Sequence, residues 1–287
     1  MMTIDQAMQS FPKRQSGAHK GSFGHVLVIA GSAGYTGAAY LASQAAALSG
    51  SGLVTLAVGK SIYPIMAAKL TEVMVRPFFE TRDYSLSLLA EKDLTAFSAG
   101  CNALAIGPGI SRNKETQQLV LNLLTRLDKR IVLDADGINA CAGHLDVIKK
   151  AGPRLILTPH PGEMAALTGK RAGDTEKARI DVAAAFAVEY NTVLVLKGKN
   201  TVVAAPGREC YVNMTGNVGM ATGGTGDVLT GMIAGFVAQG VEPFAAAVLG
   251  VHFHGLAGDI AAREKGVVSL IATDLLKYLP EALKTLG

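Results

Sequence analysis

The sequence predicts an α/β fold with a mostly parallel central sheet, helices on both faces of the sheet, and a helical C-terminal region. Short aliphatic runs recur before residue 200, and segments with helical spacing lie between them. Beyond residue 225 only helical spacing remains. Because strands that alternate with helices form βαβ units, their crossovers cover both faces of a parallel sheet.

The expected strands are aliphatic runs that end in small or turn-forming residues. They occupy residues 25–31, 53–59, 103–109, 130–136, 154–160 and 192–198. Apolar residues at intervals of three and four predict helices between them, such as "TGAAYLASQAAALSG", and three consecutive helices after residue 225. No repeat or linker interrupts this order, so we expect residues 1–287 to form one domain.

Composition narrows the class of protein. The net charge of +4 is spread without blocks of like charge, so we expect no nucleic-acid partner. The N-terminal segment lacks the apolar stretch of a signal peptide, and we expect neither a membrane span nor a location outside the cytoplasm. Cys101, Cys141 and Cys210 are widely spaced and odd in number, which predicts free, buried thiols in a reducing compartment.

The glycine-rich stretch "NVGMATGGTGDVLTG" (217–231) is a candidate anion site. Spacing excludes the two common nucleotide signatures, because Val54 stands where a P-loop ending at "GKS" needs Gly, and Arg112 and Leu229 replace the third Gly of a dinucleotide fingerprint. Consecutive glycines before a helix instead let several backbone N–H groups converge at its positive end. We expect this anion hole at Gly223, Gly224, Thr225 and Gly226.

Asp227 follows the anion hole directly and cannot serve to bind phosphate, since like charges repel. Its better use is as a general base that takes a proton from a hydroxyl attacking phosphorus. The simpler alternative is that Asp227 is an acid favoured by the helix dipole and that the glycines form only a turn.

Six motifs in a fixed order carry a resemblance that spans nearly the whole chain. They are "HKGSFGHVLVIAGSAGYTGAAYLA", "AIGPG", "VLDADGIN", "LTPHPGE", "VLKGKNTVVA" and "GNVGMATGGTGDVLTGMIAG". The chain resembles the ribokinase-like superfamily and, within it, the ADP/ATP-dependent NAD(P)H-hydrate dehydratases. The resemblance implies a ribokinase-like three-layer fold and a dehydratase domain without the epimerase domain of fused relatives.

The resemblance also implies which residues bind the two substrates. Hydrated NADH or NADPH would contact Ala38, Ala39, Gly109, His160 and Asp227. Small residues suit such positions, because a bulky dinucleotide must approach the backbone closely. The adenine nucleotide would contact Lys197, Gly198, Lys199, Asn200, Thr201 and Gly226.

The "TPHPGE" segment distinguishes the dehydratases from related vitamin kinases, in which Asn takes the place of His160. His160 can hydrogen-bond a polar ligand without an obligatory charge. The alternative is a loop histidine that only satisfies a backbone group. Glu163 can hold Mg²⁺ near the phosphates through a bound water.

Several further polar residues have open roles. Asp134 and Asp136 follow a strand at the expected ligand edge, where a place near Mg²⁺ and helix capping by Asp136 are both reasonable. His252 and His254 lie on an apolar helix and are expected to be core residues, not metal ligands. His19 and Lys20 fit a position near the ligand as well as a surface segment.

The function implied by the resemblance is ADP-dependent dehydration of the S-epimer of hydrated NADH or NADPH, which yields NAD(P)H, AMP and phosphate. Mg²⁺ and ADP, or ATP, are the implied cofactor and co-substrate, and a homotetramer is the implied assembly. The alternatives are a small-molecule kinase for a vitamin precursor such as hydroxymethylpyrimidine, and a non-catalytic nucleotide-binding protein.

Overall fold

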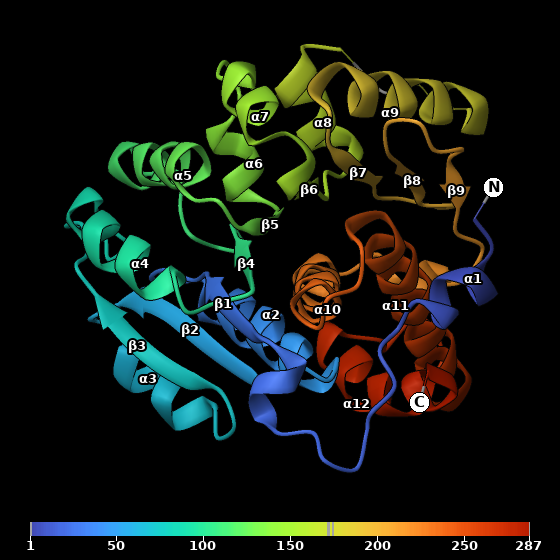
Figure 1. Ribbon diagram of the computed structural model, residues 1–287, viewed down its shortest axis with the longest axis horizontal. Helices are drawn as coiled ribbons and strands as arrows, with labels where there is room; N and C mark the ends of the chain where they lie inside the picture. Colours follow the sequence, from blue (N-terminus) through green and yellow to red (C-terminus); the bar gives the residue numbers. More distant parts are fainter. Residues whose placement is uncertain (1, 171–172, 174, 287) are drawn as a thin grey trace.

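The computed structural model describes residues 2–170, 173 and 175–286. In this part of the chain one nine-stranded sheet has the order β3-β2-β1-β4-β5-β6-β7-β8-β9 (Figure 1). Strands β1 to β7 pair in parallel, whereas β8 and β9 pair antiparallel at one edge. The strands are β1 His25–Ile29, β2 Leu53–Gly59, β3 Met74–Phe78, β4 Ala103–Ile106, β5 Arg130–Leu133, β6 Leu155–Leu157, β7 Val193–Leu196, β8 Val202–Ala204 and β9 Tyr211–Val212. The predicted α/β fold with a mostly parallel sheet is confirmed.

The six expected strands correspond to β1, β2, β4, β5, β6 and β7, but most end earlier than predicted. Residues such as 134–136 leave the sheet because they form the turns that carry polar groups into the next segment. Strand β3 was not expected, since it is a largely exposed edge strand that contains Pro77. Strands β8 and β9 are too short to show a clear periodicity.

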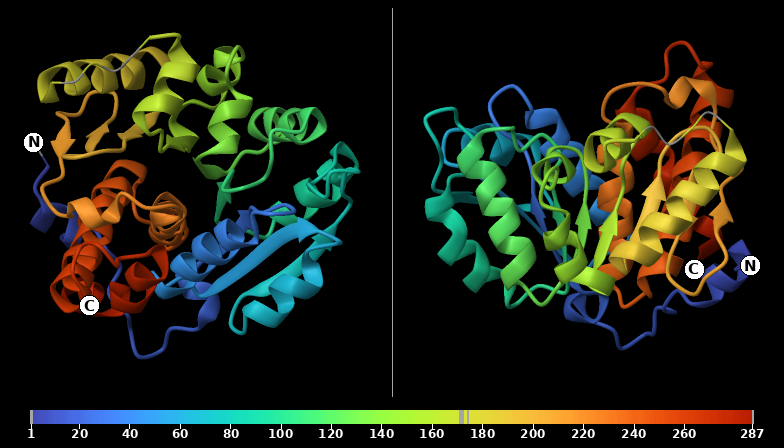
Figure 2. Two further views of the ribbon diagram at one scale, coloured as in Figure 1. Left: turned by 180° about the vertical axis from the view of Figure 1, so that it is seen from behind. Right: turned by 90° about the horizontal axis from the view of Figure 1, so that it is seen from above.

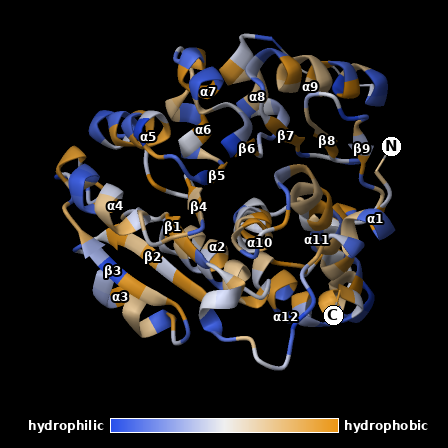
Figure 3. Cartoon of the chain, viewed as in Figure 1, coloured by the Kyte–Doolittle hydropathy of each residue, from blue (hydrophilic) through white to orange (hydrophobic). Residues whose placement is uncertain are grey.

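Helices cover both faces of the sheet because the inner strands bury side chains on each side. In β1, Val26 and Val28 belong to one apolar core, and Leu27 and Ile29 belong to the other. Figure 2 shows the two helical layers on opposite faces, and Figure 3 shows the hydrophobic strands between them. One layer consists of α2 Thr36–Leu48, α3 Tyr63–Lys69, α10 Thr225–Ala238, α11 Pro243–Lys265 and α12 Ala272–Ala282, with the short α1 Ile4–Gln9 beside α11. The other consists of α4 Glu91–Ser98, α5 Lys114–Arg126, α6 Asp136–Ala140, α7 Leu145–Ala151, α8 Pro161–Thr168 and α9 Glu176–Tyr190.

Helix α10, which follows the glycine-rich stretch, lies in the middle of its layer and is seen almost end-on in Figure 1. It packs closely on α2, because a Cβ atom on Gly231 would come within 2.0 Å of the carbonyl oxygen of Ala42. This contact holds the middle of α10 against α2.

Helix α11 is the one helix in the described residues that is long and apolar enough to cross a membrane by length and composition. However, 78% of its apolar window is buried inside the protein, as in a core helix. Cys101 and Cys141 are also buried, as predicted, whereas Cys210 is only half-buried.

Candidate active site

The N-terminus of α10 is open to an anion. Gly224 precedes the helix with a φ of 94° and offers no side chain to cap it. The hydroxyl of Thr225 instead donates to the carbonyl oxygens of Met220 and Thr222, both at 3.1 Å. These two bonds stabilise the turn that precedes the helix. Because the first N–H groups of a helix have no intrahelical acceptor, those at 225–227 can donate hydrogen bonds to an anion.

Asp227 lies in the first turn of this helix and is partly buried. Burial, and after it the neighbouring Asp134 carboxylate, raise the pKa of Asp227 to about 7, while Lys197 opposes part of the shift. A carboxylate with a pKa near neutrality can accept a proton effectively at physiological pH. The structure therefore gives Asp227 the properties that a general base needs.

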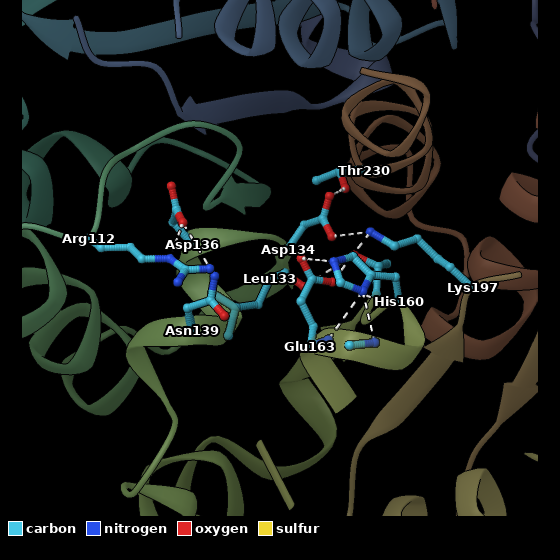
Figure 4. A network of polar contacts seen from close by, with 11 residues as sticks. Arg112, Leu133, Asp134, Asp136, Asn139, His160, Glu163, Lys197 and Thr230 are labelled. Atoms are coloured by element: carbon cyan, nitrogen blue, oxygen red, sulfur yellow. Dashed lines mark hydrogen bonds and ion pairs between the residues drawn. The ribbon is translucent and has the colours of Figure 1, made fainter. Parts of the chain in front are cut away.

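Lys197 directly follows strand β7, beside this turn, and forms an ion pair with the buried Asp134. Its Nζ lies 2.7 Å from Oδ1 of Asp134 and 3.8 Å from Oε2 of Glu163 (Figure 4). Although burial alone would lower the pKa of Lys197, the Asp134 and Glu163 carboxylates raise it above its ordinary value. A Cβ atom on Gly226 would lie 3.2 Å from Nζ, so the missing side chain lets the helix approach the ammonium.

His160 and Glu163 form a capping box at the start of α8. The His160 Nδ1 accepts from the backbone N–H groups of Gly162 and Glu163, and Glu163 Oε2 accepts from the His160 N–H at 2.8 Å. With Nδ1 accepting, the ring proton is assigned to Nε2, which lies 3.3 Å from Glu163 Oε1. Burial raises the pKa of the Glu163 carboxyl above its ordinary value. The imidazole remains more than half exposed, so a ligand can still reach it.

Three of the predicted substrate contacts, Ala38, Ala39 and Gly109, lie in the segments that follow the adjacent strands β1 and β4. Strand order reverses there, which is where open α/β sheets bind ligands. A Cβ atom on Gly109 would lie 2.7 Å from Cβ of Tyr35 and 3.0 Å from Cβ of Ala38, and one on Gly31 would lie 2.7 Å from Cβ of Ala39. Small residues thus allow these two segments to pack closely against each other.

The predicted nucleotide contacts at 197–201 form the turn between β7 and β8. Gly198 has a φ of 143° and Asn200 a φ of 53°, so the turn needs unusual backbone conformations at two positions. Arg179 of α9 donates to the carbonyl oxygens of Leu196, Lys197 and Lys199 and braces the turn from outside. Lys199 itself is exposed.

The residues with open roles separate into two groups. Asp134 and His254 lie at the site: Asp134 pairs with Lys197, and His254 Nε2 lies 2.8 Å from the carbonyl oxygen of Thr225, with a pKa lowered to about 4 by burial. His254 is therefore neutral and donates to this carbonyl. Asp136 begins α6 and accepts from the Ser111 N–H at 3.1 Å, which ties down the loop after β4.

His19 and Lys20 lie away from the glycine-rich turn. They begin the short 3₁₀ turn Lys20–Phe23, and the next residue, Gly24, packs on the carbonyl of Ala238 at the far end of α10. The 14 residues of α10 span about 20 Å, so the two segments occupy opposite ends of this helix.

Sequence reasoning missed three contributors: Thr230, Arg179 and the hydrogen bond of His254. Thr230 is a buried residue whose hydroxyl donates to Oδ2 of Asp134 at 2.7 Å. Asp134 could be suspected because it directly follows a strand, but Thr230 and Arg179 lie inside helical patterns that give no such signal.

The site suits a divalent cation that is bound together with phosphate. No group of three His, Cys, Asp or Glu side chains that could hold a metal ion occurs among the described residues. Mg²⁺, however, keeps several waters and uses one or two carboxylates together with substrate phosphates. Asp134, Glu163 and Asp227 surround a single ammonium, and this excess of negative charge fits a cation that arrives with the nucleotide.

Comparison with known proteins adds an independent observation. Residues 26–281 match the family model described as NAD(P)H-hydrate dehydratase. The bifunctional NAD(P)H-hydrate repair enzyme of Moorella thermoacetica is 46% identical over 286 residues, which cover 100% of this chain and 54% of that protein. The chain thus spans about half the length of the bifunctional relatives it matches.

Two further matches cover both partners almost completely. The ADP-dependent (S)-NAD(P)H-hydrate dehydratase of Bacillus subtilis is 34% identical over 282 residues, covering 98% of this chain and 97% of that protein. A crystal structure of the ADP/ATP-dependent NAD(P)H-hydrate dehydratase from Bacillus subtilis, co-crystallised with ATP and Mg²⁺, has a TM-score of 0.84 at 32% identity and covers 99% of this chain and 98% of that one. The predicted ribokinase-like fold is confirmed.

Proposed function

Because the chain belongs to the NAD(P)H-hydrate dehydratase family, we propose that it catalyses the ADP-dependent dehydration of the S-epimer of hydrated NADH or NADPH. The products are NAD(P)H, AMP and phosphate. The observation that carries the proposal is Asp227, a carboxylate whose pKa is raised to about 7 at the uncapped N-terminus of α10. The names of the relatives support dehydration over the vitamin-kinase alternative.

Hydroxide is a poor leaving group, so the proposed reaction first converts the ring hydroxyl into a phosphate ester. Asp227 removes the proton from the ring hydroxyl, whose oxygen then attacks the β-phosphorus of ADP, and the bond between this phosphorus and the bridging oxygen of AMP breaks. The ring now carries a phosphate ester. Loss of phosphate from one ring carbon and of a proton from its neighbour restores the double bond of NAD(P)H. The oxygen of the removed water leaves in the phosphate, and its two hydrogens leave as the protons taken from the hydroxyl and from the neighbouring ring carbon.

The backbone N–H groups of 223–226 stabilise the oxygens of the phosphoryl group in transit, as positioning and electrostatics dominate such transfers. Lys197 adds a positive charge beside this group. Glu163 would hold Mg²⁺ through a bound water, and the cation would neutralise phosphate charge when bound. Ala38, Ala39, Gly109 and His160 would bind the dinucleotide, and residues 198–201 the adenine nucleotide.

The test is recovery of NADH. Purified protein is incubated with hydrated NADH, ADP and Mg²⁺, and we expect the absorbance of NADH to return. Asp227→Asn should abolish this recovery and leave ADP binding largely intact, whereas Asp128→Asn, a change at a fully exposed carboxylate, should behave like the wild type. Absence of recovery with both ADP and ATP would refute the proposal, and mass spectrometry would reveal the stable phosphorylated product of a kinase.

We also propose a cytoplasmic homotetramer. Free cysteines support a reducing compartment. Several apolar side chains on the surface support contact between subunits, notably Val268 (95% exposed), Val218 (77%) and Met214 (75%). Sedimentation velocity tests the assembly, and a monomer at micromolar concentration would contradict it.

A further inference from the structure

A series of buried polar contacts links helix α10 to residues 197–201, the turn between β7 and β8. Thr230 lies three residues after Asp227, and its hydroxyl donates to Asp134 Oδ2 at 2.7 Å. The other oxygen of the same carboxylate accepts from Lys197 Nζ, also at 2.7 Å (Figure 4). Thr230 is 0% exposed and Asp134 is 1% exposed. Each oxygen of Asp134 therefore has a partner on a different element, which fixes the orientation of the carboxylate.

The Lys197 ammonium, at the end of this series of contacts, faces the candidate site. The side chain of Lys197 is 18% exposed, in contrast to that of Asp134. The ammonium lies at the first turn of α10, where a Cβ atom on Gly226 would be 3.2 Å from Nζ. A lysine has a flexible four-carbon stem, so its charge is placed accurately only when a rigid partner holds it.

A purely structural role explains this arrangement less well. Burying an ion pair is costly, and packed apolar residues of similar volume often give equal or greater stability. This ion pair is anchored by Thr230 of α10 and has its cation at the open N-terminus of the same helix, which is better explained by a need to place a charge.

We propose that Asp134 and Thr230 are positioning residues that hold the Lys197 ammonium against the phosphoryl group as it moves from the nucleotide to the substrate. Neither residue need contact a substrate for this role. The inference rests on the proposed dehydration, which supplies the phosphoryl group in transit.

The test uses Thr230, because removing the Asp134 carboxylate would leave Lys197 buried without its partner and could prevent folding. Thr230→Val preserves shape and removes only the hydroxyl. We expect kcat to fall about tenfold, since small misplacements of catalytic groups are costly. We expect the KM for hydrated NADH to change by less than about twofold, because Lys197 acts on the phosphoryl group. Thr230→Ser, which restores the hydroxyl, should recover most of the lost kcat.

Thr116→Val is the matched control. Thr116 is a similarly buried threonine on α5. Its hydroxyl donates to the Leu86 carbonyl at 2.7 Å and lies 2.9 Å from Ser85 Oγ, with no hydrogen bond to Asp134 or Lys197. This variant should lose a similar amount of thermal stability and keep the wild-type kcat. A wild-type kcat in Thr230→Val, or a failure of Thr230→Ser to recover activity, would overturn the positioning role.

Binding of ADP separates this inference from the proposed function. Calorimetry with ADP and Mg²⁺ needs no turnover, and we expect Thr230→Val to weaken binding several-fold while Thr116→Val does not. A wild-type protein that binds ADP without dehydrating hydrated NADH would refute the proposed function alone. Unchanged ADP affinity in Thr230→Val would then refute the positioning role as well.

Discussion

Asp227 shows how neighbours determine the chemistry of a single side chain. Burial disfavours its ionised form, and the Asp134, Glu163 and Asp136 carboxylates disfavour it further. Lys197 offsets only part of this effect. An aspartate that would ordinarily be a weak base thus becomes one whose pKa is close to neutrality.

This environment predicts the acid limb of the pH profile. The base must be deprotonated, so its active form is depleted as the pH falls through the raised pKa of about 7. We expect kcat/KM to be nearly constant above this value and to fall about tenfold for each pH unit below it. Initial rates at saturating ADP and Mg²⁺ between pH 5.5 and 8.5 measure the profile, and a rate independent of pH down to 5.5 would rule out Asp227 as the base with this pKa.

At the scale of the element, α8 shows that one side chain can serve both a helix and a site. The His160 ring takes the N-cap position, and Glu163 completes the capping box. The sequence pattern His-Pro-Gly-Glu contains the spacing of a capping box, but it does not reveal whether the histidine also contacts a ligand. Both interpretations remain compatible with an imidazole that is more than half exposed.

Two substitutions separate these roles. Asparagine is a good N-cap residue, so His160→Asn should keep the thermal stability and remove only the imidazole. His160→Ala removes both and should cost about 1 kcal/mol in the free energy of unfolding. If His160 binds the dinucleotide, we expect the KM for hydrated NADH to rise about tenfold in both variants, as for loss of one good hydrogen bond. A wild-type KM in His160→Asn would show that the histidine is only a cap. Thr175→Ala, which removes the N-cap hydrogen bond of α9, controls for the loss of a cap elsewhere.

The elements also show what a sequence can predict. Inner strands such as β4 and β5 were recognisable because burial on both faces selects continuous aliphatic residues. The edge strand β3 lacks this constraint and was missed. The glycine-rich turn was recognisable because its backbone requirements are local. The partnership of Thr230 with Asp134 was not, since it joins residues 96 positions apart that only the assembled sheet brings together.

At the scale of the whole molecule, the candidate site is assembled from distant parts of the chain at the carboxyl ends of the parallel strands. Ala38 lies in the first turn of α2, Gly109 follows β4, His160 precedes α8, Lys197 follows β7 and Asp227 lies in α10. None of these segments places the others without the central sheet, whose parallel strands direct their carboxyl ends to the same edge. The nucleotide site is therefore a property of the folded state alone.

This dependence predicts a coupling between nucleotide binding and stability. A ligand that binds only the folded state stabilises it by about 2.7 kcal/mol at a concentration of 100 times its Kd. For a protein of this size, we expect ADP with Mg²⁺ to raise the melting temperature by about 5–10 °C. Differential scanning fluorimetry with increasing ADP measures the shift.

Two lysine variants, one as the test and one as the control, check this coupling. Lys197→Met removes the charge at the turn and should abolish most of the shift, even though its melting temperature without ADP is itself lowered by the unpaired Asp134. Lys92→Met changes an exposed lysine on α4, outside the predicted nucleotide contacts, and should retain most of the shift. Equal shifts in the wild type and Lys197→Met would mean that ADP binds elsewhere on the protein. A shift that depends on Lys197 would place the nucleotide beside the Lys197 ammonium, the N-terminus of α10 and Asp227. The same positive charge would then serve both nucleotide binding and phosphoryl transfer.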